Sequence, residues 1–424
     1  MEKKPQKIVA IRGMEDILPP ASRAWRNIEE RAAHLFSLYG YEEIRTPIVE
    51  PTALFERGVG ETSSIVEKEM YSFVDKSDNH LTLRPEGTAP VVRAFIESAA
   101  YAQSAITRYW YFGPMFRYER PQKGRQRQFY QLGCELFGTT SPYADAEVMA
   151  MTAQFFAELG LSGITLQVNS IGCPHCRPTY NERLLQFLQQ HLASLCEDCN
   201  RRMAKNPLRV LDCKNAACHE ILKDAPTIGT FWCGECRTHF EAVQTGLRSF
   251  SVAFEVNERI VRGLDYYVRT AFEFTSHNLG SQNAVAAGGR YDGLVRDLAG
   301  PDVPGVGIAM GVERLLLLLE HAGKTSVDQQ PLVFVAALST AAIEAVLPHM
   351  SKLRQGGVRV EWDYEAKSLK SQMRHADKLG AQSVVIIGDD ELAKGLAIVR
   401  NMQTKTQEEI PFDQIERYFV PVRV

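Results

Sequence analysis

Residues 109–138, with the sequence YWYFGPMFRYERPQKGRQRQFYQLGCELFG, constrain the fold of this chain more than any other stretch. Hydrophobic and aromatic residues flank a polar centre, a pattern that predicts two strands joined by a long loop. Between residues 116 and 130 a single acid, Glu119, stands against five basic residues: Arg117, Arg120, Lys123, Arg125 and Arg127. Arginine binds phosphate oxygens in pairs and keeps its charge, and aromatic faces stack on bases, so the hairpin favours a polyphosphate or nucleotide. A charged edge hairpin that resists aggregation is the alternative, and this stretch alone leaves both open.

A second segment, GVGIAMG at 305–311, runs into Val312-Glu313-Arg314 and five leucines at 315–319. Small residues let the backbone approach a ligand closely, and so short an apolar run predicts a buried helix. Arg314 falls in the first helical turn, where a cation opposes the helix dipole and needs an anionic partner or other compensation. A dinucleotide fold is not indicated, because no acid marks a ribose site downstream. A P-loop is excluded at 323–325, because the template needs glycine where this chain has Leu318.

Six motifs resemble those of a known enzyme family and occur in that family's order. The stretches at 116–119 and 125–129 resemble motif 2 of the class II aminoacyl-tRNA synthetases, and 305–319 resembles their motif 3. The remaining four are typical of the histidyl-tRNA synthetase family: Ile11-Arg-Gly-Met-Glu-Asp16, Leu83-Arg-Pro-Glu-Gly-Thr88, Arg262-Gly-Leu-Asp-Tyr-Tyr267 and Gly288-Gly-Arg-Tyr-Asp-Gly293. The resemblance covers essentially the whole chain.

The domain organisation follows from the pattern along the chain. Strand-like runs at 165–169 and 252–256 lie about 80 residues apart, too far for a loop, so a mainly helical insert is expected at about 171–251. A polar linker at 321–331 precedes strands alternating with helices, which predicts a small α/β domain with a largely parallel sheet. The first domain, rich in hairpins, should be an α+β domain with an antiparallel sheet flanked by helices. The resemblance implies a catalytic domain at 1–325 and an anticodon-binding domain at 331–424.

The resemblance implies that ATP, with Mg²⁺, activates L-histidine to an adenylate and releases pyrophosphate. Negative charge spreads over phosphate oxygens in such a transition state, so fixed cations are expected to stabilise it. By resemblance Arg117 binds the α-phosphate, Arg314 the γ-phosphate, and Arg262 acts on the α-phosphate during attack. Glu119 and Arg125 complete the expected ATP site. The alternative for Arg262 is a surface pair with Asp265.

The same resemblance implies a histidine pocket that reads both imidazole nitrogens and the charged head of the amino acid. Glu135 and Tyr267 are expected at the ring, Glu86 at the ammonium and Gln131 at the carboxylate. Strand alternation places Gln131, Gly133 and Glu135 on one face and Cys134 on the other. The remaining pocket residues are expected to be Gly87, Thr88 and Tyr266.

Transfer of histidine to the 3′ end of tRNA(His) requires a surface for RNA. Gln122, Lys123 and Arg125 at the hairpin tip are expected near the acceptor stem. Basic residues spaced 3, 4 and 4 apart predict one helix face in the C-terminal domain, and a solvated face is the alternative: Lys367, Lys370, Arg374 and Lys378. Motif 1 of the family is resembled at 45–50, which implies a homodimer.

Eight of the nine cysteines lie between 173 and 236, in four close pairs. Cys173/Cys176 and Cys196/Cys199 are separated by 19 residues, which matches a four-cysteine zinc template. Cys213/Cys218 with Cys233/Cys236 then form a second expected site. Reduced, metal-free thiols are the alternative. Zinc in such closed sites is expected to brace the insert and take no part in catalysis.

Composition restricts the other possibilities. The net charge of −3 is compatible with RNA binding through local basic patches. Neither a secretory signal nor a membrane span is expected, so a cytoplasmic enzyme is predicted. The alternative function is a catalytically inactive, synthetase-like regulatory subunit of histidine biosynthesis. Such proteins lose the pattern that this chain keeps at 262–267, and they also lose the C-terminal domain. A plain RNA-binding module would not explain Glu86 and Glu135.

Overall fold

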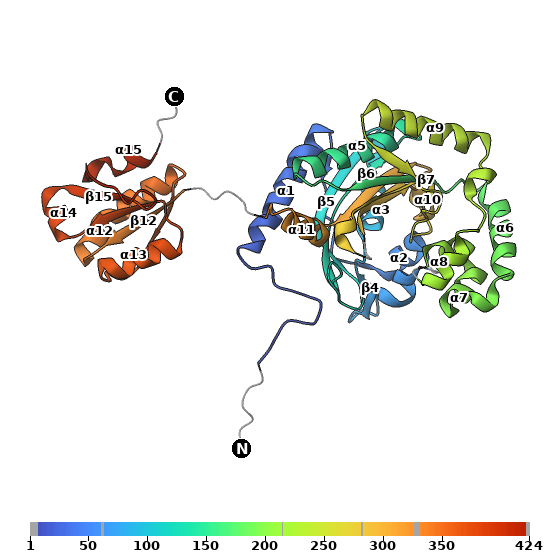
Figure 1. Cartoon of the computed structure of the whole chain (residues 1–424), viewed down its shortest axis with the longest axis horizontal. Coiled ribbons are helices and arrows are strands. Elements are labelled where there is room, and N and C mark those ends of the chain that lie inside the picture. Colours follow the sequence, from blue (N-terminus) through green and yellow to red (C-terminus); the bar gives the residue numbers. More distant parts are fainter. Residues whose placement is uncertain (1–6, 61–62, 214, 281–282, 326–330, 421–424) are drawn as a thin grey trace, which may run out of the picture. The chain divides into compact units, whose positions relative to one another are not determined.

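The computed structural model describes residues 7–60, 63–213, 215–280, 283–325 and 331–420. The chain divides into two compact units, Met1–Ser326 and Val327–Val424 (Figure 1). Within the predicted linker, residues 326–330 lie outside the described part of the chain. Each unit has its own sheet and its own core.

The first unit is built on a sheet of eight strands in the order β1-β5-β6-β11-β10-β9-β7-β8. The five inner pairings are antiparallel, and only β1 and β8 pair in parallel, at the two edges. The predicted antiparallel sheet and its hairpin, β5 with β6, are therefore confirmed. The strands are β1 Glu42–Glu43, β5 Thr107–Phe116, β6 Gln128–Phe137, β7 Thr165–Ser170, β8 Phe254–Val256, β9 Val268–Thr275, β10 Ala284–Arg290 and β11 Gly305–Gly311.

One face of this sheet is fully covered by helices. Alternation along β6 sends Leu132, Cys134 and Leu136 into the core under those helices. The helix nearest the N-terminus, α1, buries Ile28, Ala32 and Leu35 at helical spacing. Figure 1 shows two of the four helices, α5 and α9, packed side by side. The four are α1 Ala21–Leu38, α5 Pro142–Glu158, α9 Gly234–Ser249 and α11 Val312–His321.

The opposite face is only partly covered, which leaves room for a site. A second core packs Val91 and Phe95 against Tyr111 and Tyr291. The helices here are α2 Thr52–Val59, α3 Thr88–Glu97, α4 Ala100–Gln103 and α10 Leu294–Asp297, with the single turn η1 Ile65–Glu69; the turn η5 His277–Leu279 packs instead against α11. A small antiparallel sheet joins them, formed by β2 Val49–Pro51, β4 His80–Leu83 and β3 Tyr71–Val74.

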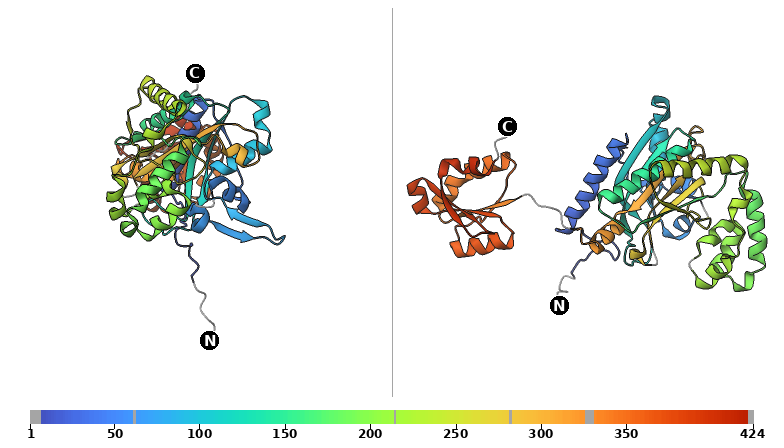
Figure 2. Two further views of the ribbon diagram at one scale, coloured as in Figure 1. Left: turned by 90° about the vertical axis from the view of Figure 1, so that its right-hand side faces the viewer. Right: turned by 45° about the horizontal axis from the view of Figure 1, so that its top comes forward.

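Between β7 and β8 every regular element that the structure describes is helical. The core of this helical insert packs Tyr180, Leu184 and Leu188 against Val210 and Leu222. Figure 2 shows these helices as a cluster beside the sheet. They are α6 Arg177–Gln189, η2 Leu192–Ser194, α7 Glu197–Lys205, η3 Pro207–Asp212, α8 Ala216–Leu222 and η4 Ile228–Phe231, followed by α9.

The second unit is an α/β domain with a five-stranded sheet in the order β13-β12-β14-β15-β16. β13, β12 and β14 are parallel, as predicted, whereas β15 and β16 are antiparallel. The sheet is therefore mixed: β15 turns back beside β14 after the short helix α14, and a turn without a helix joins β15 to β16. The elements are β12 Leu332–Ala337, α12 Thr340–Gln355, β13 Arg359–Trp362, α13 Leu369–Lys378, β14 Ser383–Ile387, α14 Asp389–Lys394, β15 Leu396–Asn401, β16 Gln407–Pro411, η6 Phe412–Gln414 and α15 Ile415–Phe419. Within the described residues no helix is long and apolar enough to span a bilayer.

The motif at 288–293 contributes a buried ion pair that joins the sheet to α5. Arg290 and Asp145 are both fully buried, and the Arg290 guanidinium binds both carboxylate oxygens of Asp145. Arg290 also donates to the carbonyl oxygens of Thr139, at 2.8 Å, and Ser141, at 3.1 Å. The Thr270 hydroxyl donates to the same carboxylate at 2.5 Å. Because the Arg290 guanidinium finds all these hydrogen-bond acceptors inside the protein, this arginine has a structural role.

Arg290→Met should therefore destabilise the first unit by about 3–5 kcal/mol, since it leaves the Asp145 carboxylate buried without its cation. The midpoint of urea unfolding, followed by tryptophan fluorescence, measures the change. Arg296→Met is the matched control, because Arg296 is exposed and pairs only with surface acids. Equal midpoints for the two variants would contradict this role.

Candidate active site

One cavity opens on the partly covered face of the sheet, between the β5–β6 hairpin, the start of α3, β10, β11 and the first turn of α11. It is lined by most of the residues that the motifs nominate: Glu86, Thr88, Arg117, Glu119, Arg125, Gln131, Arg262, Tyr266, Tyr267 and Arg314. Residues from five separate stretches of the sequence therefore meet in one hollow.

Arginines gather at one end of the cavity. The Arg117 guanidinium lies over the Phe129 ring, 5.1 Å from its centroid, and its Nε donates to the carbonyl of Pro85 at 2.8 Å. Arg314 donates from Nε to the carbonyl of Gly124 at 3.3 Å. Burial, and then the charges of Arg125 and Arg117, lower the pKa of Arg314. This concentration of positive charge favours an anionic ligand such as a polyphosphate.

Arg125 has a carboxylate partner within the site, because its Nε lies 2.9 Å from Glu119. Arg125 therefore turns into the cavity, whereas its neighbours Gln122 and Lys123 at the hairpin tip are exposed. Of the three residues expected near an acceptor stem, Gln122 and Lys123 project into solvent and Arg125 lines the cavity beside the other arginines.

Arg262 lies against the sheet and not on the surface. Its Nη1 is 2.5 Å from Glu273 on β9, and its guanidinium lies 5.4 Å from the centre of the Tyr267 ring. Burial alone would lower the pKa of Arg262, but Glu273 and then Tyr267 raise it above its ordinary value. The alternative of a surface pair with Asp265 is wrong, because Asp265 binds Arg209 of the insert at 2.9 Å.

Carboxylate, amide and phenol groups also line the cavity. Glu86 accepts hydrogen bonds from the backbone N–H groups of Thr88, at 2.7 Å, and Ala89, at 2.8 Å, at the start of α3. Burial raises the pKa of Glu86. The rings of Tyr266 and Tyr267 lie side by side, with centroids 4.5 Å apart. These groups can recognise a small zwitterion through several directional contacts.

Several polar atoms in the cavity wall are buried without a hydrogen-bond partner among the described residues. They include the Tyr266 hydroxyl, Oε1 of Gln131 and Nε of Arg262. Buried polar groups are normally paired, and each unpaired group costs about 1–3 kcal/mol. A ligand with both donors and acceptors would satisfy them.

Glu135 and Gly87 lie behind the cavity wall and do not line it. The Glu135 carboxylate accepts from the Thr88 hydroxyl at 2.7 Å, from Tyr111 at 3.4 Å and from Tyr291. A side chain at Gly307 would collide with this carboxylate, its Cβ falling 1.8 Å from Oε2. The space left at Gly307 therefore admits a carboxylate of the protein itself, where the sequence suggested close approach of a ligand.

Burial raises the pKa of Glu135 to about 8, although its three hydroxyl partners favour the charged form. The residue is on the face predicted from alternation, with Cys134 on the other side of the sheet. Its full environment was not visible in the sequence, because Tyr111 and Tyr291 come from strands and turns far from it in the chain.

The basic stripe of the second unit differs from the prediction. α13 begins at Leu369, after the N-cap residue Ser368, so Lys367 precedes the helix and does not share its face. Its ammonium lies 3.3 Å from Asp363 and 3.2 Å from Glu365. Lys370, Arg374 and Lys378 remain on α13, exposed and four residues apart.

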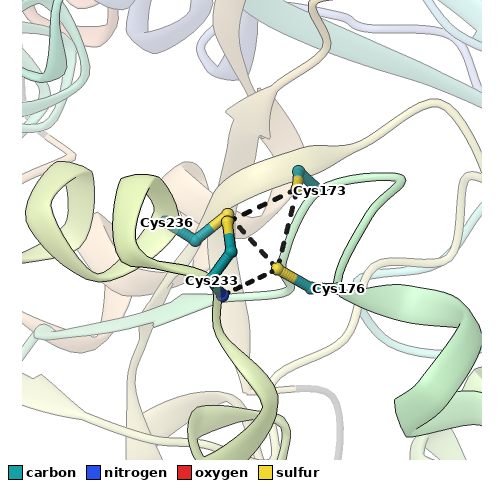
Figure 3. A group of neighbouring side chains, drawn as sticks. All are labelled: Cys173, Cys176, Cys233 and Cys236. Atoms are coloured by element: carbon teal, nitrogen blue, oxygen red, sulfur yellow. Dashed lines mark hydrogen bonds between the residues drawn. The ribbon is translucent and has the colours of Figure 1, made fainter.

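The cysteines form two groups of four, but the predicted grouping is wrong. Cys173 and Cys176 meet Cys233 and Cys236, and the second group is Cys196, Cys199, Cys213 and Cys218. Figure 3 shows the first group, with two cysteines before α6 and two at the start of α9. The reason is topological: the chain returns to β8 through α9, and the start of α9 lies at the end of β7, where Trp232 donates to the Ser170 carbonyl at 3.0 Å, so the outer pairs come together.

Several cavity residues were not identified from the sequence, among them Phe129, Asp212, Glu273 and Glu313. Glu273 had a usable signal, since it is a charged residue between Phe272 and Phe274 on a strand. Burial raises the pKa of Glu313 to about 7, and its carboxylate accepts the Tyr130 N–H at 2.9 Å. Asp212 had no local signal, because it reaches the cavity from the insert.

Comparison with known proteins agrees with this architecture. The model of the family described as "Histidyl-tRNA synthetase" matches residues 13–315, and "Anticodon binding domain" matches residues 332–420. A histidine–tRNA ligase of Geobacter sulfurreducens is 53% identical over 95% of this chain and 97% of its own length. One from Geobacter metallireducens is also 53% identical, over 96% of this chain and 98% of its own. The crystal structure of apo S. aureus histidyl-tRNA synthetase has a TM-score of 0.83 at 37% identity and covers 98% of this chain and 100% of its own.

The fold is that of a class II aminoacyl-tRNA synthetase, with a catalytic domain and a C-terminal anticodon-binding domain. Within that class, the chain belongs to the histidyl-tRNA synthetase family.

Glu135 should make stability depend on pH. Its pKa is raised in the folded protein, so the folded state binds the proton more tightly than the unfolded state does. The stabilisation is complete below the unfolded pKa of about 4.5 and is lost as pH rises through about 8. Glu135→Gln should flatten the fall in unfolding free energy between pH 5 and 8, by up to ~1.4 kcal/mol per pH unit. Urea unfolding of both proteins across this range measures it, and parallel curves would contradict it.

Proposed function

We propose that this chain is a histidine–tRNA ligase. It joins the carboxylate of L-histidine to the α-phosphate of ATP, releases pyrophosphate, and transfers the histidyl group to the 3′ end of tRNA(His). The observation that carries the proposal is a single cavity lined by four arginines together with Glu86, Gln131, Tyr266 and Tyr267. That arrangement holds a polyphosphate and an amino acid next to each other.

In the first step, Arg117 and Arg314 hold the triphosphate, with Glu119 and Arg125 beside them. Arg262 stabilises the charge that develops on the α-phosphate oxygens during attack, as a preorganised donor does. Mg²⁺ prefers carboxylate oxygens together with substrate phosphates, and Glu119 and Glu273 in the cavity wall offer such oxygens. When bound, the ion would neutralise phosphate charge. Phe129 offers an apolar face for adenine.

Histidine occupies the opposite end of the cavity. Glu86 binds its ammonium group and Gln131 its carboxylate, while Thr88, Gly87 and Tyr266 shape the pocket. Tyr267 and Glu135 read the two imidazole nitrogens. Because Glu135 lies behind the wall, the imidazole N–H takes over the contact that the Thr88 hydroxyl makes at 2.7 Å.

Transfer to tRNA uses both units. We assign 1–325 as the catalytic domain, with the insert at about 171–251, and 331–424 as the anticodon-binding domain. Gln122 and Lys123 meet the acceptor stem, and Lys370 and Arg374 form part of the RNA surface of the second unit. The charge of Lys367 is compensated by its acidic neighbours, so we leave this residue out of the RNA surface. We place the enzyme in the cytoplasm, where translation takes place.

The alternative of an inactive regulatory subunit is disfavoured by the same features. The 262–267 segment is present and reaches the cavity, and the anticodon-binding unit is matched over residues 332–420. ATP–pyrophosphate exchange across the standard amino acids separates the two functions. Exchange should depend on L-histidine alone, followed by charging of tRNA(His). No exchange with any amino acid would support the regulatory function instead.

Arg262→Ala should lower the rate of adenylate formation by about 10²-fold or more and leave the fold intact. The reason is that Arg262 acts on charge that appears only in the transition state, so the loss falls on kcat. Arg259→Ala is a matched control three residues away, since its guanidinium binds the Lys223 carbonyl at 2.6 Å, on the insert. Near-normal exchange by Arg262→Ala would remove this residue from the mechanism.

We also propose a homodimer, because motif 1 at 45–50 carries exposed apolar residues. Ile48 and Val49 are 42% and 40% exposed, next to the strand β2. A two-fold interface there would bury the same patch on both copies. Ile48→Asp should weaken dimerisation by about tenfold or more in sedimentation. Leu347→Asp, at 45% exposure in the second unit, is the control. A wild-type protein that stays monomeric at every concentration would refute the dimer.

A further inference from the structure

Each group of four cysteines has the spacing of a tetrahedral metal site. We name Cys173, Cys176, Cys233 and Cys236 the neck cluster, and Cys196, Cys199, Cys213 and Cys218 the inner cluster. In the neck cluster, sulfur–sulfur separations are 3.6, 3.9 and 3.7 Å, and the inner cluster has one of 3.8 Å. Four thiolates at about 2.3 Å from zinc lie ~3.8 Å apart, whereas a disulfide would bring two sulfurs to about 2.05 Å. The geometry therefore fits zinc.

Backbone N–H groups point at the sulfurs of both clusters. Cys233 N–H donates to Sγ of Cys176 at 3.1 Å in the neck cluster. In the inner cluster, Cys196 N–H donates to Sγ of Cys218 at 3.2 Å and Asn215 N–H to Sγ of Cys213 at 3.4 Å. Such contacts stabilise thiolates and orient metal ligands. Most of the eight cysteines are buried, so their thiolate charge needs a cation.

Next to each cluster lies an arginine that binds the catalytic segment, residues 262–267. In the neck cluster, Arg177 follows Cys176 directly and donates to the backbone carbonyl of Tyr267 and, at 3.2 Å, to that of Ile171. Arg177 is therefore fixed at the point where the insert leaves the sheet. Its contact holds the end of the segment that carries the paired tyrosines.

The second arginine, Arg209, lies next to the inner cluster. Arg209 lies in η3, just before Cys213, and binds Asp265 through Nη2 at 2.9 Å and Nε at 3.2 Å. It also donates to the carbonyl of Gly263, the residue after Arg262. Asn206 adds a contact to Asp265 at 2.9 Å. Asp212, adjacent to Cys213, lines the cavity itself.

We propose that both clusters bind Zn²⁺ and that the two ions position Arg177 and Arg209 on the catalytic segment, so that adenylate formation depends on zinc. The sequence suggested the opposite, that metal would brace the insert alone. The ions take no part in the chemistry, because closed four-cysteine sites leave no open coordination position. Arg177 and Arg209 are positioning residues that act through the segment carrying Arg262 and Tyr267. The kinetic part of this inference rests on the proposed ligase function.

The first test measures metal and activity in the full-length chain. Elemental analysis should find two zinc ions per chain, and Co²⁺ substitution should give the absorption of tetrahedral thiolate coordination. Protein made metal-free by a chelator should show at least tenfold lower kcat in histidine-dependent exchange, with the ATP KM changed by less than about threefold, and added zinc should restore it. A metal content near zero without cobalt absorption would overturn the sites. Full exchange activity in protein shown to be metal-free would overturn the coupling.

The second test separates positioning from folding. Arg209→Ala should keep its two zinc ions and its melting temperature but lose about tenfold in kcat, and Arg209→Lys should recover part of it. Arg201→Ala is the matched control on the neighbouring helix, since Arg201 is exposed and, among the described residues, its ion-pair partner is Asp198. Equal kcat for Arg209→Ala and Arg201→Ala would overturn the role of Arg209. If zinc-loaded wild type shows no histidine-dependent exchange, the ligase proposal fails, while metal content and cobalt absorption still decide the sites.

Discussion

The pairing of β6 with β11 is the constraint on which the rest of the site depends. Its antiparallel register sets Gln131 against Gly311 and Glu135 against Gly307. The hairpin that carries the arginines is thereby fixed beside the first turn of α11, which carries Arg314. A shift of one residue would move Gln131 and Glu135 to the helix-covered face and place Cys134 under the cavity. Register is specified strongly here, because one face buries a large apolar core.

Charge is divided along the cavity in a way that explains its selectivity. Arg117 and Arg125 lie close enough to Arg314 to repel its charge, while Glu86 and Glu135 are kept away from water, and burial raises the pKa of both. A ligand with anionic charge at one end and donor groups at the other relieves both conditions at once. Burial therefore works together with charge, since each group is partly unsatisfied until the correct ligand is bound.

The sequence predicted what depends on local pattern. The hairpin, the alternation along β6 and the position of Arg314 in a first helical turn all follow from residue types at fixed spacing. The predicted grouping of the cysteines was wrong because spacing rules consider neighbours along the chain, whereas the fold brings the start of α9 to the end of β7. The prediction for Lys367 was wrong at a helix boundary, because the helix begins at Leu369, two residues later than the charge pattern implied. The surroundings of Glu135 depend on Tyr111 and Tyr291, which only the tertiary fold brings to it.

The neck cluster also affects the entropy lost when β7 and β8 pair. β7 ends at Ser170 and β8 begins at Phe254, so their parallel pairing closes a loop of more than eighty residues. The entropy lost on closing a loop grows with the logarithm of its length, by about 0.6 kcal/mol for each doubling. A cross-link between Cys173/Cys176 and Cys233/Cys236 would join the chain just after β7 to the start of α9, so that β7 and β8 would be connected through this cross-link and α9 instead of through the whole long loop. Such a closed neck makes the length of the insert nearly irrelevant to the edge of the catalytic sheet, and segments could be added or removed beyond it at little entropic cost to that edge.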